Sequence, residues 1–180
     1  MTSSHSRYSR FAILLHWLMA VTIIGLFASG IISHELDRAT AKPVIGMHKS
    51  FGVTVWLLVW VRLGWRFYHP PPPPLGRGLI TRAASLAHGL LYGLMMLVPV
   101  AGYIMTATNP FQIPTYLFNV IPLTYLGLPA DRALAQLFGT FHEIGAKVLM
   151  ALVLVHSAGA LFHHFILKDD TLRRMIKSSL

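Results

Sequence analysis

The chain has 180 residues and a formal net charge of +9; 54% of its residues are hydrophobic and only 12% are charged, about half the charged share of an ordinary soluble domain. This composition excludes a typical soluble globular protein and indicates an integral membrane protein. Cysteine is absent, which excludes disulfides and thiolate-bound zinc or iron–sulfur centres within this chain.

Four apolar stretches follow one another along the chain, at residues 11–32, 44–67, 83–107 and 137–167. Each is long enough to cross about 30 Å of hydrocarbon as an α-helix, which takes roughly 20 residues. A soluble four-helix bundle would carry a polar stripe on every helix, and these stretches carry only scattered histidines. The sequence therefore predicts an all-α, integral membrane four-helix bundle that forms a single membrane domain over residues 1–180.

Two of the connections between these spans contain many prolines. Residues 69–78, "HPPPPPLGRG", hold five prolines, which prevent helix continuation and favour a stiff polyproline II spacer. Residues 109–136 hold four prolines and an apolar, aromatic stretch. This segment is too broken to span a membrane, so we expect it to form a cap at the membrane surface.

Basic residues are concentrated on one side of the predicted bundle. Ten of the fifteen Lys and Arg residues lie there: Arg7, Arg10, Arg62, Arg66, Arg77, Arg82, Lys168, Arg173, Arg174 and Lys177. The positive-inside rule makes this side cytoplasmic and places both termini in the cytoplasm. Membrane topology then explains the positive charge, so no nucleic-acid partner is needed.

Six histidines fall within the spans at two depths. His16, His88, His156 and His163 belong to the predicted cytoplasmic half, and His48 and His142 lie near the opposite face. The fourteen residues from His142 to His156 correspond to roughly 21 Å along a helix and about 40° around it, so both side chains lie on one face. Ionisable groups in lipid are costly and usually functional.

Three uses of such histidines compete: a proton relay, a zinc site, or axial ligation of haem. Any single one of them also fits a packing role. Zinc normally takes three or four close protein ligands, and the level of His48 and His142 offers two. Two facing imidazoles suit haem, because the porphyrin supplies the other four nitrogens. Gly52, Gly145 and Gly159 lie on the same helix faces as the candidate ligands and would leave room for a flat macrocycle, although glycine is also common at membrane helix contacts.

Several motifs resemble one known family along nearly the whole chain. They are "RFAILLHW" in the first span, "HKSFG" and "VRLGWR" in the second, "HGLLYGLMMLVPVAG" in the third, "FHEIGAKV" and "HSAGALFHHF" in the fourth, and the tail "KDDTLRRM". Together they resemble the bacterial dihaem cytochrome b561 family, and within it the small, stand-alone members described as superoxide oxidases. The resemblance implies two b-type haems in a multi-pass protein of the bacterial inner membrane.

The resemblance also implies which residues hold each group. In related cytochromes the fourth span supplies one ligand to each haem iron, and the first and second spans supply the other. On this sequence, that pairs His16 with His156 near the cytoplasm and His48 with His142 near the periplasm. It further implies that His88 and His163 border a ubiquinone site, with packing as the alternative for His88.

Arg62 lies fourteen residues after His48, at the cytoplasmic level. It is a candidate partner for a haem propionate, and an ordinary positive-inside anchor is the alternative. Lys49 adjoins His48, and Lys147 forms an i, i+4 pair with Glu143. These lysines would attract a small anion such as superoxide to the periplasmic level. The alternative for Lys147 is that it neutralises Glu143 or extends toward the membrane interface.

We therefore expect a superoxide:ubiquinone oxidoreductase, which oxidises superoxide to dioxygen at the periplasmic face and passes the electrons through two haems to ubiquinone. Its partners are membrane lipid, superoxide and ubiquinone; a partner protein subunit is compatible with this function but not required. The alternative is a non-enzymatic cytochrome b subunit that accepts electrons from a hydrogenase or dehydrogenase. A haem-free, proton-coupled transporter is a third class, which a visible spectrum would separate from the other two.

Overall fold

A computed structural model describes residues 7–75, 78–111, 114–123, 125 and 127–177, so Arg77 and both chain termini lie outside the described residues. Four long helices dominate it: α1 (Arg10–Glu35), α2 (Arg38–Tyr68), α3 (Leu79–Ala107) and α4 (Arg132–Phe162). Each has the length and hydropathy of a membrane span, and the apolar stretch of α4 continues to Phe165. The four-helix membrane fold predicted from the sequence is confirmed.

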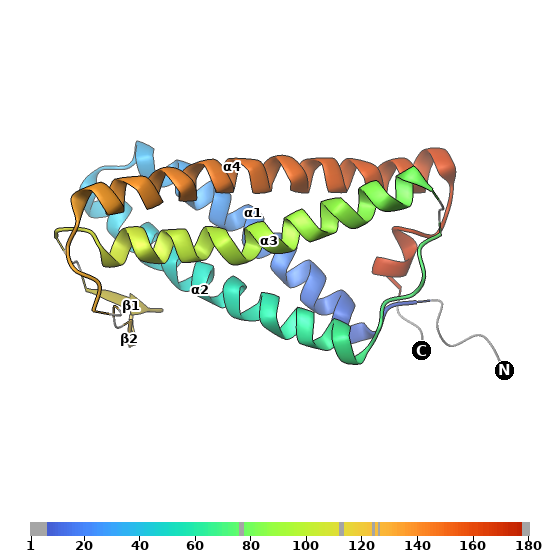
Figure 1. The fold of residues 1–180 in the computed structure, drawn as a ribbon, viewed down its shortest axis with the longest axis horizontal. Helices are drawn as coiled ribbons and strands as arrows, with labels where there is room; N and C mark the ends of the chain where they lie inside the picture. Colours follow the sequence, from blue (N-terminus) through green and yellow to red (C-terminus); the bar gives the residue numbers. More distant parts are fainter. Residues whose placement is uncertain (1–6, 76–77, 112–113, 124, 126, 178–180) are drawn as a thin grey trace.

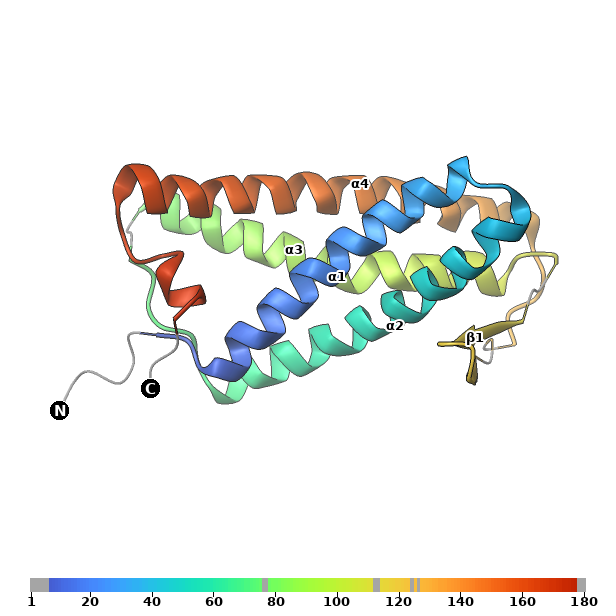
Figure 2. The ribbon, with the colours of Figure 1, turned by 180° about the vertical axis from the view of Figure 1, so that it is seen from behind.

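The helices form one antiparallel bundle. Contacts join α1 to α2, α2 to α3, α3 to α4, and α4 back to α1 (Figure 1). The pair α3 and α4 lies side by side along its length, whereas α1 runs obliquely across the face between α2 and α4 (Figure 2). Every helix therefore passes close to the middle of the bundle, where residues from different spans can meet.

Capping residues explain where several helices begin. The carboxylate of Asp37 accepts hydrogen bonds from the backbone N–H groups of Ala39 and Thr40, and from the Thr40 hydroxyl. The Thr40 hydroxyl and these amides hold the pKa of Asp37 below its usual value. Such a cap satisfies amides that have no partner within the helix. Asp131 caps α4 in the same way through the N–H of Leu134.

A cluster of buried apolar side chains lies midway along the bundle. It consists of Met19, Ile23, Val55, Val59, Leu91 and Leu149. Leu149 lies seven residues from His142 and seven from His156, so this apolar cluster separates the two histidine levels. Most other large apolar side chains point outward, as expected for a surface in contact with lipid.

One end of the bundle carries a short β-hairpin, and we call it the hairpin end. Strands β1 (Thr115–Leu117) and β2 (Ile121–Leu123) pair antiparallel, with Leu117 opposite Ile121. The backbone N–H of Phe118 donates to Ser50 Oγ of α2 at 2.9 Å. The sequence predicts a cap over residues 109–136, and the structure shows that residues 115–123 of this segment form a hairpin bound to α2. Residues 112, 113, 124 and 126 lie outside the described residues.

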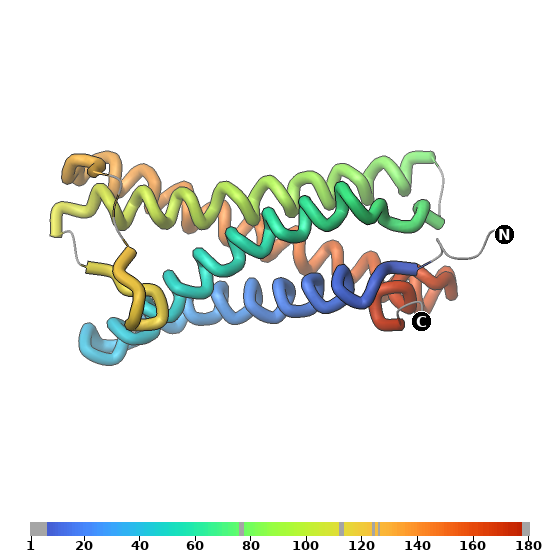
Figure 3. Tube along the Cα trace, turned by 90° about the horizontal axis from the view of Figure 1, so that it is seen from below, coloured from blue at the N-terminus to red at the C-terminus, as the bar shows by residue number. Residues whose placement is uncertain are grey.

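The opposite end, which we call the terminal end, holds the start of α1 and the chain after α4 (Figure 3). The α-helical geometry of α4 stops at Phe162, and a π-helical turn (His163–Leu167) carries the chain to the predicted end of the span. A 3-10 turn (Arg173–Met175) follows. Trp17 of α1 donates its indole N–H to the Met175 carbonyl at 2.7 Å, so the chain after α4 folds back against α1.

Candidate functional site

His48 of α2 and His142 of α4 face each other in the hairpin half of the bundle. Their ring centres are 6.0 Å apart, and both rings are half-buried. Iron binds an imidazole nitrogen at roughly 2 Å, and the ring centre lies about 1 Å behind that nitrogen, so two opposed axial ligands have ring centres about 6 Å apart. The spacing of this pair therefore fits a haem iron between the rings.

Hydrogen bonds determine which nitrogen of each imidazole ring carries the proton. His142 Nδ1 lies 2.9 Å from the Val98 carbonyl oxygen of α3, which can only accept, so Nδ1 carries the proton. His48 Nδ1 lies 3.0 Å from Ser29 Oγ of α1, and the Ser29 hydroxyl already donates to the Leu26 carbonyl. Ser29 Oγ therefore accepts from His48. Both histidines keep the lone pair on Nε2, as ligation through that nitrogen requires.

Glycines allow His142 to reach the Val98 carbonyl. A Cβ atom at Gly102 would lie 2.8 Å from Nδ1 of His142, and one at Gly145 would lie 2.8 Å from a Val98 methyl group. Both distances are shorter than atoms tolerate, so the close approach of α3 and α4 depends on these two positions.

A second pair lies in the terminal half. The ring centres of His16 (α1) and His156 (α4) are 6.1 Å apart, the spacing calculated for opposed iron ligands. His88 of α3 also lies against His156, at 5.3 Å. This distance is shorter than two opposed ligands need, so the geometry favours His16 over His88 as the second ligand and places His88 beside the pair.

Arg62 is brought to this level, as its spacing predicts, but its partner in the structure is a histidine. Its Nη1 atom lies 3.0 Å from Nδ1 of His16. A guanidinium group only donates, so this contact makes Nδ1 of His16 an acceptor and puts the ring proton on Nε2. Binding of iron through Nε2 requires Arg62 to leave Nδ1, which distinguishes this level from the hairpin level.

His163 lies beyond the terminal-level pair, in the π-helical turn. Its Nδ1 atom lies 2.6 Å from Oδ2 of Asp169, and the Thr171 N–H donates to the other carboxylate oxygen at 2.8 Å. Partial burial raises the pKa of Asp169, but the hydrogen bonds from His163 and Thr171 outweigh this effect and lower it to about 2.

The lysines near the hairpin level differ in their surroundings. Lys49 is half-buried, and its Nζ donates to Thr115 Oγ1 of the hairpin at 3.1 Å. Lys147 pairs with Glu143 at 2.6 Å, and both side chains are 65% exposed. Lys49 is therefore held in place beside His48, whereas the charge of Lys147 is neutralised at the surface.

The glycines near the candidate ligands have different surroundings. A Cβ atom at Gly52 or Gly159 would meet nothing within 4 Å, whereas Gly145 packs against Val98 of α3, so it serves a helix contact and does not leave room for a macrocycle. Across the described ranges, no three His, Cys, Asp or Glu side chains converge to hold a bare metal ion. Paired imidazoles suit a metal that brings its own equatorial ligands, such as haem iron, better than zinc.

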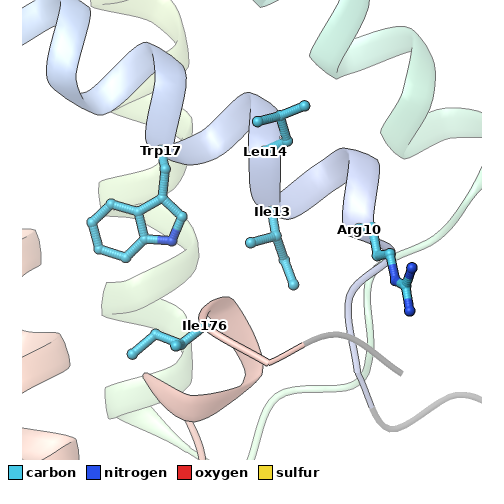
Figure 4. A pocket seen from close by; sticks show the side chains of 5 residues that line it. All are labelled: Arg10, Ile13, Leu14, Trp17 and Ile176. Carbon is cyan, nitrogen blue, oxygen red and sulfur yellow. The ribbon is translucent and has the colours of Figure 1, made fainter. Parts of the chain in front are cut away.

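A shallow groove of about 310 Å³ opens at the terminal end between α1 and the chain after α4. Its lining is formed by Arg10, Ile13, Leu14, Trp17 and Ile176, with Ile13 and Trp17 pointing toward Ile176 (Figure 4). Neither of the predicted quinone residues lines it.

Some contributors to the site were missed in the sequence. Ser29, Val98 and Gly102 orient or admit the ligand candidates of the hairpin level. Gly102 had a usable signal, because a glycine within a membrane span often marks a close helix contact. The role of the Val98 carbonyl had none, because every residue carries a backbone carbonyl.

Residues 7–178 match the family described as prokaryotic cytochrome b561. The chain is 32% identical to cytochrome b561 homolog 2 of Escherichia coli (strain K12), across 99% of this chain and 95% of that protein. It is 31% identical to cytochrome b562 of Cereibacter sphaeroides, across 94% and 95%. It is 27% identical to a probable superoxide oxidase, CybB, of Yersinia pestis, across 96% and 97%.

Proposed function

We propose that this chain, which belongs to the prokaryotic cytochrome b561 family, is a superoxide:ubiquinone oxidoreductase. Members of the family bind haem b, so the chain is a multi-pass haem protein of the bacterial inner membrane with a redox role. In the proposed reaction two superoxide anions lose one electron each and leave as dioxygen. One ubiquinone gains the two electrons and two protons and leaves as ubiquinol.

The observation that carries the proposal is the presence of two imidazole pairs at two levels. The hairpin level has His48 and His142, and the terminal level has His16 and His156, with ring centres 6.0 and 6.1 Å apart. We assign one b haem to each pair. When bound, two such haems supply one-electron carriers at two depths of the membrane.

At the hairpin level the protein orients the ligands and supplies positive charge. The Val98 carbonyl and Ser29 Oγ hold the protons of His142 and His48 on Nδ1. The Lys49 ammonium group is fixed beside His48 by Thr115. A fixed positive charge raises the local concentration of a small anion such as superoxide, so we place electron entry at this level, on the predicted periplasmic face.

At the terminal level we assign quinone binding to His88 and His163. An imidazole can donate a hydrogen bond to a quinone oxygen and can exchange a proton near neutral pH. His88 lies beside the His16 and His156 pair, and His163 lies closer to the aqueous end of α4. Arg62, which must leave His16 Nδ1 when iron binds Nε2, is free to pair with a propionate group.

Experiments on the isolated protein test the proposal. Two low-spin b haems per chain in the visible spectrum, rapid haem reduction by superoxide, and haem reoxidation by a ubiquinone analogue are expected together. A chain with both haems that reacts with neither substrate, and that co-purifies with a hydrogenase or dehydrogenase subunit, would instead be an electron-transfer subunit. The 27% identity to a probable superoxide oxidase of Yersinia pestis supports the enzyme.

A further inference from the structure

The end of α4 leaves α-helical geometry and closes a loop around His163. The π-helical turn begins at His163, and Lys168 then adopts a left-handed conformation with φ 55°. This reversal lets the backbone N–H of Asp169 donate to the His163 carbonyl at 3.1 Å. It also carries the Asp169 side chain back onto the imidazole ring. π-Helical turns of this kind are common at functional sites.

The hydrogen bonds of the loop define the state of each partner. Oδ1 of Asp169 accepts from the Thr171 N–H, and Oδ2 accepts from His163 Nδ1 at 2.6 Å. The pKa of Asp169 is lowered to about 2 by His163 and Thr171, against the opposing effect of partial burial. Asp169 is therefore a carboxylate under cellular conditions and can only accept, so one ring proton of His163 stays on Nδ1. Nε2 is left as the nitrogen that gains and loses a proton.

We propose that Asp169 is the positioning residue of His163 and holds one ring proton on Nδ1, so that Nε2 is the nitrogen that exchanges a proton with the quinone; this inference rests on the proposed quinone reaction, in which His163 serves the quinone. His163 in its imidazolium form gives the Nε2 proton to one quinone oxygen as the quinone is reduced. The neutral imidazole keeps its proton on Nδ1, which donates to the Asp169 carboxylate, and Nε2 then regains a proton from water at the terminal end. One such cycle supplies one of the two protons that ubiquinol formation requires.

The neighbouring carboxyl group lacks this arrangement and serves as a control. Asp170 contacts Arg173 at 3.5 Å, and their side chains are 64% and 65% exposed. The side chains of His163 and Asp169 are only 23% and 27% exposed, so solvent and salt screen their interaction less. Asp169→Asn and Asp170→Asn remove the same charge one residue apart, and only the first acts on His163.

The tautomer of His163 gives a direct test that does not depend on turnover. In Asp169→Asn, Oδ1 continues to accept from the Thr171 N–H, so the amide Nδ2 takes the place of Oδ2. This group donates, which forces His163 to accept at Nδ1 and to carry its proton on Nε2. Nitrogen-15 NMR of histidine-labelled, dithionite-reduced protein should show this exchange, with the His163 signals assigned from a His163→Gln variant. Asp170→Asn should keep the original tautomer.

Kinetics with a ubiquinone analogue provide the second readout. Asp169→Asn should retain both haems in the spectrum but slow haem oxidation by the quinone roughly 10- to 100-fold, less than the roughly 10²- to 10⁴-fold that complete loss of a general acid causes, because His163 itself is still present. Asp169→Glu, which restores a carboxylate, should keep the original tautomer and recover most of the rate. Asp170→Asn should change the rate less than about twofold.

The outcomes separate this inference from the function on which it rests. If quinone does not oxidise the haems of the unmodified protein, the proposed function is wrong. If quinone does so, and Asp169→Asn keeps both the tautomer and the rate, Asp169 does not position His163 and this inference is overturned. A changed tautomer with an unchanged rate would also overturn it, because the proton would then reach the quinone by another route.

Discussion

Replacing Gly102 by alanine should weaken haem binding at the hairpin level and spare the terminal level. The added Cβ atom would lie 2.8 Å from Nδ1 and 2.9 Å from Cε1 of His142, so the imidazole must move away from α3. Overpacking of this kind costs about 1–3 kcal/mol, and loss of the hydrogen bond to the Val98 carbonyl costs about 0.5–1.5 kcal/mol more.

A combined cost of about 1.5–4.5 kcal/mol lowers the haem affinity of this level roughly 10- to 1,600-fold, at about 1.4 kcal/mol per factor of ten. Haem titration of the apoprotein, followed in the visible spectrum, measures this affinity. Gly89→Ala is the matched control, because Gly89 is exposed on the same helix and an added Cβ there meets nothing within 4 Å. If Gly102→Ala binds both haems as tightly as Gly89→Ala does, His142 is not a haem ligand.

Three further outcomes follow from the assigned roles. His142→Ala should halve the haem content while sparing the haem of the terminal level, and a haem-to-protein ratio near one in the unmodified chain would contradict the two-haem assignment. His163→Ala should keep both haems but slow their oxidation by quinone in stopped-flow measurements; loss of a haem instead would make His163 a ligand. Lys49→Gln should slow haem reduction by superoxide more than Lys147→Gln does, because Lys147 is already neutralised by Glu143. The difference between the two variants should shrink toward 1 M salt, where the Debye length is about 3 Å. Equal rates for both lysine variants and the unmodified protein at low salt would show that neither lysine guides superoxide.

The four spans and the two histidine levels could be predicted from the sequence because both depend on distances along one helix. The rise per residue and the thickness of the hydrocarbon layer are fixed, so apolar length predicts a span and fourteen residues predict two levels on one face. The structure confirms the four-helix bundle. The cytoplasmic location of the termini and the roles of His48 and His142 remain predictions, since the first depends on the membrane and the second on a bound group.

Contacts between different helices could not be derived in this way. Three such contacts depend on how far each helix is rotated and shifted against its neighbours. They are the contacts of the Val98 carbonyl with His142, of Arg62 with His16, and of Lys49 with the hairpin. Those parameters are set by side chains packing across the whole interface, such as Gly145 against Val98, and no short sequence pattern records them. The sequence by itself therefore determined the level of each imidazole along its helix, whereas the tertiary structure decided which side chains face it and on which nitrogen it carries its proton.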